Sequence, residues 1–325
     1  MSDDIDKLSP QELNALKRRI DQRLKSLDTA QADGALTELS GKDTVDLVAI
    51  AVKRTGIRCR TLASGTPVTL RPQGGVRHEA EAHILTVRPA RSWTFKRTTY
   101  LSGRISQMRL DAAALKLTPL QLKDEYPWDP AKEGWAEDSE TIPGWFKPIL
   151  AAGVRPSFEM EQILPGFDPN DIDDPDSDPV GQAVDLAEAG DFLEAEKVLQ
   201  RCLEQDLRAL DAHAHLGNIN FRDGSRRFCV ERARRHYEAG VAIADLSLGP
   251  RFNGVLQWGR LDNRPFLRCL HGLALCLWAL GEFDSAREAF QRLLWLNPGD
   301  NQGARICLEE VAARREYEPD DEPEL

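Results

Sequence analysis

The chain has 325 residues, 41% of them hydrophobic and 29% charged, with a formal net charge of −11. This length exceeds that of one typical domain, so two or more folded units are expected. No stretch approaches the roughly 18 uninterrupted apolar residues of a membrane span, and the acidic, polar N-terminus excludes a secretory signal. These features predict a cytoplasmic protein with no membrane partner.

The charge is unevenly distributed along the chain. Residues 53–109 contain twelve Lys or Arg against two Glu, whereas residues 110–185 contain 17 acidic residues against five basic ones. Opposite blocks of this kind indicate different roles for the two segments.

The six cysteines are scattered, form no CxxC pair and lack a histidine cluster at zinc-binding spacing. We therefore expect free thiols in a reducing compartment, with neither a metal site nor a cofactor.

The N-terminal segment, 1–42, is expected to be a helix followed by a connector. Ser9 suits an N-cap and Pro10 the first helical position of a helix over 9–27. The apolar residues of this helix fall at spacings of three and four on one face; they are Leu13, Leu16, Ile20, Leu24 and Leu27. This face is expected to dock on the chain itself, with a dimer contact as the alternative, so the oligomeric state stays open.

A basic, β-rich domain is expected over 43–117. Val45, Val48, Ile50 and Val52 indicate a short helix over 43–54, and a second short helix is expected over 111–117. Between them, partial alternation, β-branched residues and Gly or Pro turn signals predict four or five short strands. Strands this short and close together favour a small barrel or a strongly curved sheet.

The same segment carries candidate residues for binding nucleic acid or other anions. Arginines alternate along its strands, and aromatic residues are interleaved with cations near position 95. Spread cations attract phosphates and exposed aromatic rings stack on bases. The candidates are Arg58, Arg60, Arg91, Lys96 and Arg97. The alternative, which alternation favours, places Trp93, Phe95 and Tyr100 in the core and leaves a solvated arginine face or one that docks the acidic segment.

Residues 118–178 are expected to form an acidic linker, rich in Trp and Pro, that wraps on a neighbouring domain as ordered coil. The stretch 168–179 is the expected hinge. Asp174, Asp176, Asp178 and Asp185 occupy positions one, three, five and twelve of a calcium-loop pattern. However, Pro179 stands where that loop needs glycine, so a solvated linker is favoured over a metal site.

The C-terminal half contains a repeated helical pattern. Two amphipathic runs flank a Gly-Asp-Phe turn at 190–192, and the same arrangement recurs around Gly-Glu-Phe at 281–283 and ends at Pro298. A distorted copy lies between them. Over about 176–300 this pattern resembles the tetratricopeptide repeat (TPR), whereas the N-terminal part resembles no family. The resemblance implies an α-solenoid of about three helical hairpins over 179–316, followed by an acidic tail over 317–325.

The resemblance also implies a concave face that binds peptide segments of other proteins. Candidate residues for this groove are His215, Asn218, Arg264 and Arg268, with solvated positions as the alternative. A second set on one helix of the middle repeat, Arg226, Arg227 and Arg234, is a candidate for recognising acidic peptide or phosphate, with a solvated face as the favoured alternative. An insertion over 246–265 is expected to lie on the binding face.

The overall prediction is an α+β protein of several domains that acts as a non-enzymatic cytoplasmic adaptor for a protein or peptide partner. The sequence contains no Gly-rich phosphate loop, nucleophile elbow or metal triad. The main alternative is a nucleic-acid- or ribosome-associated protein that uses the basic β-rich domain. An enzyme with its active site between the two halves is the weaker third reading.

Overall fold

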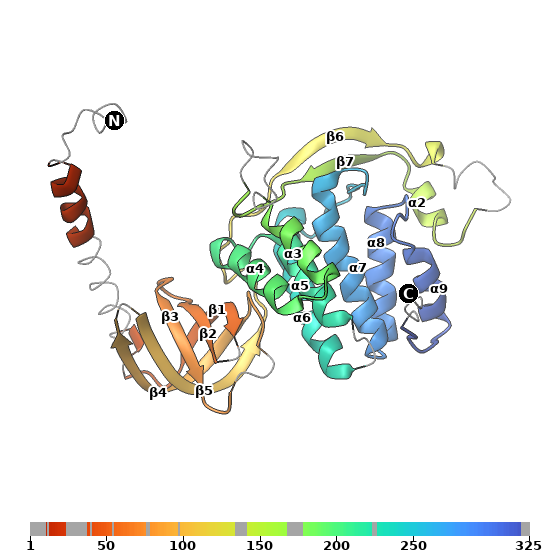
Figure 1. The fold of residues 1–325 in the computed structure, drawn as a ribbon. Coiled ribbons are helices and arrows are strands. Elements are labelled where there is room, and N and C mark those ends of the chain that lie inside the picture. The colour runs from red at the N-terminus through yellow and green to blue at the C-terminus, as the bar shows by residue number, and fades with distance from the viewer. Residues whose placement is uncertain are drawn as a thin grey trace. The chain divides into compact units, whose positions relative to one another are not determined.

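The computed structural model describes residues 11, 13–23, 38–39, 41–53, 55–75, 79–96, 98–133, 142–167, 178–222 and 226–319. The chain is a mixed α/β protein that divides into two compact units. One unit is Met1–Arg77 with Ile84–Arg109, and the other is His78–His83 with Leu110–Leu325. Figure 1 shows the strands of the first unit and the helices of the second. Within the described ranges, no helix combines the length and the apolar character that crossing a bilayer requires.

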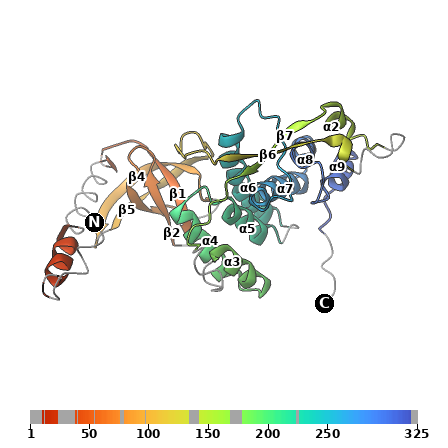
Figure 2. The ribbon, with the colours of Figure 1, turned by 90° about the horizontal axis from the view of Figure 1, so that it is seen from above.

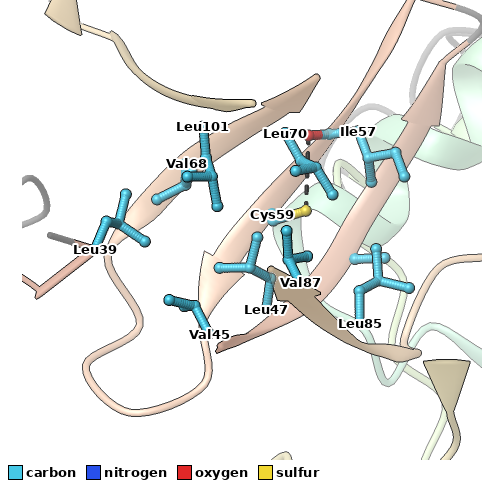
Figure 3. Close-up of a cluster of buried hydrophobic side chains, with 11 residues drawn as sticks. Leu39, Val45, Leu47, Ile57, Cys59, Val68, Leu70, Leu85, Val87 and Leu101 are labelled. Carbon is cyan, nitrogen blue, oxygen red and sulfur yellow. Dashed lines mark hydrogen bonds between the residues drawn. The ribbon is translucent and has the colours of Figure 1, made fainter. Parts of the chain in front are cut away.

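Five strands form the first unit: β1 (Val45–Lys53), β2 (Gly56–Thr61), β3 (Pro67–Pro72), β4 (Ile84–Phe95) and β5 (Thr98–Arg109). Their hydrogen-bonded order, β1-β2-β3-β5-β4, closes on itself as a barrel because β1 also pairs with β4. All the pairings are antiparallel except that of β3 with β5. The strands alternate so that one set of side chains fills the interior, including Leu47, Leu70 and Leu101, which Figure 3 shows pointing toward one another.

The helix expected over 43–54 is wrong, because β1 occupies these residues. Six of the nine β1 residues are buried. Apolar periodicity alone does not separate such a short buried strand from a buried helix. The β-branched residues Val45, Val48, Ile50 and Val52 favour the strand. The helix expected over 111–117 is replaced by consecutive turns over 112–116, which Lys116 ends with a positive φ of 54°.

Residues 13–23 are helical and lie inside the helix expected over 9–27. Two residues of its apolar face, Leu13 and Ile20, remain 40% and 49% exposed. The described part of this helix therefore keeps much of its apolar face in solvent.

The second unit contains seven successive helices: α3 (Pro179–Glu188), α4 (Phe192–Gln205), α5 (Leu210–Phe221), α6 (Arg227–Leu248), α7 (Arg264–Ala279), α8 (Phe283–Leu296) and α9 (Ala304–Ala312). Each helix packs against the next, and α5 also packs against α3 and α7. Figures 1 and 2 show them following one another from green to blue.

The turns after α3 and α7 have the same geometry. The amides of Gly190 and Asp191 donate to the carbonyls of Ala187 and Leu186, and those of Gly281 and Glu282 donate to Trp278 and Leu277. This is the Schellman arrangement, which requires a left-handed residue after the helix. Gly190 and Gly281 supply it with φ values of 83° and 78°.

The stretch 118–178, expected to be a linker of ordered coil, contains regular structure. Strands β6 (Leu122–Trp128) and β7 (Arg155–Met160) pair antiparallel, and η2 (Pro130–Lys132) and α2 (Lys147–Ala151) lie between them. Figure 1 shows this ribbon running across the ends of the helices. Trp128, Phe146 and Ile149 form a buried cluster with Val255 of the insertion.

The insertion over 246–265 ties this ribbon to the helices. The Val255 amide donates to Pro156 and its carbonyl accepts from Phe158, which extends the β7 edge. Asn263, in η5 (Leu261–Asn263), is fully buried and bonds to the backbone of Met160, Phe158 and Gln257. These hydrogen bonds give the insertion a structural role.

The acidic tail was expected to begin at 317, but Tyr317 packs against the helices. Its ring meets Trp278 edge-on at a centroid distance of 5.2 Å and lies 5.7 Å from Phe221. The indole of Trp278 also donates a 2.8 Å hydrogen bond to the Arg315 carbonyl. Residues 320–325 lie outside the described part of the chain.

Candidate functional site

The polar residues expected to form the groove lie on α5 and α7. His215 and Asn218 share one face of α5 because they are three residues apart, and Arg222 follows one turn later. Arg264 and Arg268 share one face of α7 because they are four residues apart. Since α5 packs against both α3 and α7, we call the surface formed by these three helices the α3/α5/α7 face.

A cavity of about 310 Å³ opens on this face between α3 and α5. Its apolar lining includes Ala183, Ala187 and Ile219. Its polar lining includes His215, Asn218 and Arg222, with one carboxylate from Glu188. The cavity therefore combines apolar surface with hydrogen-bond donors, which is the usual composition of a binding pocket.

Aromatic rings hold two of the polar side chains. The Tyr237 hydroxyl of α6 donates a 2.6 Å hydrogen bond to Oδ1 of Asn218. This bond engages the acceptor atom of the amide, so its nitrogen can donate to a ligand. The Arg222 guanidinium carbon lies 3.5 Å from the centroid of the Phe192 ring, a close cation–π contact. Tyr237 and Phe192 thus orient the Asn218 and Arg222 side chains.

Asp211 links α5 to α7. Arg268 Nη1 donates a 2.7 Å hydrogen bond to Asp211 Oδ1, and His215 Nε2 lies 3.6 Å from the same oxygen. Burial lowers the pKa of His215, and the Arg268 charge lowers it further, while Asp211 opposes both effects. With a pKa below the ordinary value of 6.5, His215 is predominantly neutral at pH 7.

Arg264 is not among the residues that line the cavity. Its Nε donates a 3.1 Å hydrogen bond to the Trp258 carbonyl, and its guanidinium lies 5.2 Å from the Trp258 ring. The structure thus brings His215 and Asn218 into one cavity and joins Arg268 to them through Asp211. Arg222 was not predicted from the sequence to line the groove, although its spacing of four from Asn218 places it on the same helix face.

The arginines of α6 are engaged within the helical unit. Arg227 pairs with Glu231 at 2.9 Å, and Arg234 pairs with both Glu238 at 2.6 Å and Glu282 at 2.7 Å. Arg226, the residue before α6, also has interaction partners. Because neighbouring carboxylates already occupy Arg227 and Arg234, these two residues are poorly disposed to bind an external anion.

The predicted cations of the barrel lie on its outer surface. Arg58 and Arg60 alternate with buried neighbours on β2, and both are exposed. Arg91 and Lys96 are exposed on β4 and in the turn that follows it, whereas Arg97 lies outside the described residues. The aromatic residues near them, Trp93, Phe95 and Tyr100, are absent from the barrel core. The alternative that alternation favoured, which placed them in the core, is therefore wrong.

A second and larger cavity, of about 700 Å³, was not anticipated. It lies among α2, the turn before it, α8 and α9, and its apolar lining includes Trp145, Ile149, Leu294, Trp295 and Leu308. Its residues come from segments more than 130 positions apart in the sequence. No local pattern joins segments so distant, so only the folded chain shows this cavity.

A buried polar cluster connects the segment 79–83 to α4 and α6. Glu81 is 1% exposed; it accepts a 3.1 Å hydrogen bond from Gln200 and lies 3.8 Å from His236. Burial lowers the pKa of His83, and burial likewise lowers the pKa of His236 well below its ordinary value. The buried Glu81 carboxylate therefore contacts a neutral histidine, His236, and the side-chain amide of Gln200.

Among the described residues, no three His, Cys, Asp or Glu side chains gather as metal ligands. Asp174 and Asp176 of the calcium-loop pattern lie outside those residues. All six cysteines are free thiols, four of them buried. Comparison of the chain with protein-family models and with curated proteins finds no match in either set.

Proposed function

We propose that this protein is a non-enzymatic cytoplasmic adaptor whose helices α3–α8 form three TPR-like hairpins. In this proposal the α3/α5/α7 face binds a peptide segment of a protein partner. The observation that carries it is the cavity between α3 and α5, which is lined by hydrogen-bond donors from α5 of the second hairpin and apolar residues from α3 of the first.

The packing of the helices supports a repeat architecture. Two hairpins share the same Schellman turn, and small residues occupy equivalent places in both: Ala183 and Ala195 in the first, and Ala274 and Ala286 in the third. All four are at most 1% exposed. Small residues allow neighbouring helices to approach closely, and stacked hairpins bury apolar stripes that one hairpin alone leaves exposed.

The lining of the cavity supports a particular chemistry for the proposed partner. An apolar side chain of the peptide fits against Ala183, Ala187 and Ile219. The Arg222 guanidinium and the Asn218 amide can donate hydrogen bonds to an adjacent carboxylate of the peptide, either of a side chain or of the C-terminus. The neutral His215 adds an uncharged polar group. The favoured ligand is therefore a short segment that pairs an apolar residue with an acidic one.

Binding to a peptide array displayed as both internal and C-terminal segments tests this proposal. The selected peptides should be enriched in an apolar residue next to an acidic one, and Arg222→Ala should weaken the best of them by about tenfold or more in fluorescence anisotropy. Arg201→Ala, an exposed residue of α4 outside the cavity lining, is the matched control. An array without enrichment, or equal losses for Arg222→Ala and Arg201→Ala, would refute the proposal.

A further inference from the structure

The outer surface of the barrel carries a row of residues across four strands. Arg58 of β2 is opposite Thr69 of β3, Thr69 is opposite Tyr100 of β5, and Tyr100 is opposite Trp93 of β4. In the neighbouring row, Arg71 is opposite Ser102, and Ser102 is opposite Arg91. We call the surface formed by Arg58, Arg71, Arg91, Trp93 and Tyr100 the aromatic–basic face.

The aromatic rings of this face are arranged as a stack. The rings of Trp93 and Tyr100 lie almost parallel, with 5.4 Å between their centroids and 9° between their planes. Leu101, the neighbour of Tyr100, is fully buried, so alternation directs Tyr100 outward. Phe95, two residues beyond Trp93 on β4, is 61% exposed. Trp93 and Tyr100 are half-buried, so the three rings together still present apolar surface on the outside of the barrel, which indicates a contact surface.

Each of these rings has a cation close to it. The guanidinium of Arg71 lies 5.8 Å from the Tyr100 ring, and that of Arg91 lies 5.6 Å from the Trp93 ring. The Lys96 ammonium lies 5.7 Å from the Phe95 ring. Each aromatic ring on this surface therefore lies within 5.8 Å of a positive charge.

Carboxylates are almost absent from the strands that carry this face. Strands β1–β5 contain eight Lys or Arg residues and a single acidic residue, Asp46. Asp46 pairs with Arg109 at 2.7 Å, and hydrogen bonding by Arg109 lowers the pKa of Asp46. The barrel strands therefore carry a net positive charge, which favours an anionic ligand.

We propose that the aromatic–basic face binds single-stranded nucleic acid. Unpaired bases stack on the Trp93 and Tyr100 rings, while Arg58, Arg71 and Arg91 lie along the path of the phosphates. An acidic peptide uses the cations but has no group that matches a parallel ring stack. A duplex presents phosphates but keeps its bases stacked on one another, so it gains nothing from the rings.

Fluorescence anisotropy on the full chain tests this proposal with labelled oligo(dT) and oligo(rU) of about a dozen nucleotides, a duplex of the same length, and inorganic polyphosphate as competitor. A single strand should bind more tightly than the duplex. With the three arginines in contact, the logarithm of its association constant should fall with a slope of roughly −2 against the logarithm of salt concentration. Unequal affinities for oligo(dT) and oligo(rU) identify DNA or RNA as the preferred ligand.

Variants separate stacking from charge. Trp93→Ala and Tyr100→Ala should each weaken oligonucleotide binding roughly 5- to 150-fold and leave polyphosphate binding unchanged. Arg91→Ala should reduce the salt slope by about 0.7 for either ligand. Tyr126→Ala is the matched control, since Tyr126 is an aromatic residue 88% exposed on β6 of the second unit, and its removal should change nothing.

Three results would overturn the proposal: no binding of either oligonucleotide at low salt, equal affinity for single strand and duplex, or equal losses of oligonucleotide and polyphosphate binding in Trp93→Ala. The last result reveals a general anion surface. None of these measurements involves the α3/α5/α7 face, so the failure of either proposal leaves the other standing.

Discussion

Tyr237 is the side chain on which the packing of three helices depends, and Gly272→Ala tests this directly. A Cβ atom at Gly272 of α7 would lie within 2.7 Å of three atoms of the Tyr237 ring, and one at Gly217 of α5 would do the same. Ordinary carbon contacts are about 3.5–4.0 Å, so the ring must move by roughly 1 Å. Because Tyr237 is only 2% exposed and lies against both helices, it has little room to do so.

The size of the effect follows from two opposing contributions. Overpacking a well-packed core costs about 1–3 kcal/mol, whereas replacing a helical glycine by alanine gains about 1 kcal/mol in helix propensity. Gly272→Ala should therefore lower the free energy of unfolding by up to about 2 kcal/mol and the Tm by up to roughly 8 °C, measured by circular dichroism.

The control is the same substitution in a Tyr237→Ala background, where the ring is gone. Tyr237→Ala alone should cost about 3–5 kcal/mol, as other large aromatic truncations do. Adding Gly272→Ala to it should then be neutral or stabilising, because only the gain in helix propensity remains. If Gly272→Ala destabilises both backgrounds equally, or stabilises the natural chain, the tight packing of Tyr237 against α7 is refuted.

Three further predictions concern the helical unit. Burial lowers the pKa of His213 to about 4, so the folded state binds fewer protons than the unfolded state between pH 6.5 and 4. Its contribution to stability in urea titrations should be complete above pH 6.5 and fall by about 1.4 kcal/mol per pH unit below it. Other buried histidines add to this dependence, so His213→Asn should reduce the slope by that amount, and an unchanged slope would refute the reasoning. Gly281→Ala should cost about 1–2 kcal/mol in thermal unfolding through its left-handed backbone alone, because no atom lies within 4 Å of the added Cβ. Ala286→Leu should cost about 1–3 kcal/mol by overpacking a fully buried position, and an unchanged Tm would contradict the close helix approach there.

Local signals in the sequence predicted the helical half well, because its elements end at residues with strong backbone preferences. Gly190 and Gly281 mark the ends of α3 and α7 and adopt the positive φ that their turns require. The helices between these two turns were predicted from the spacing of their apolar residues, a pattern that is complete within a few helical turns. By contrast, β6 and β7 pair residues as far apart as Leu122 and Met160, and no local signal announces such a partner.

The candidate sites were predicted in part, for a related reason. His215 and Asn218 share a helix face, so their meeting in one cavity follows from spacing, whereas the cavity itself needs the packing of α3. The position of Trp93 outside the barrel core was not predicted, because the register of β4 against β5 shifts between Pro89 and Arg91. A shift of this kind changes which residues face outward beyond it, and alternation counted along the sequence cannot detect it.

The two proposed binding surfaces belong to different compact units, and this leads to a prediction about their coupling. Substitutions far apart that share no partner act independently to within about 0.5 kcal/mol. Arg222→Ala should therefore leave oligonucleotide affinity within about a factor of two of that of the natural chain, and Trp93→Ala should likewise leave peptide affinity unchanged.

A larger change in either affinity would contradict this independence and would show that the two surfaces share a common element. The segment 79–83 is the first candidate for such a common element, because the chain passes through it between the two units. The segment joins β3 to β4 of the barrel, yet Glu81 within it is buried against Gln200 and His236 of the helical unit. Binding free energies are coupled reciprocally, so a real linkage must appear with equal size in both measurements. Gln200→Leu, which removes the 3.1 Å hydrogen bond to Glu81, should then reduce both couplings together.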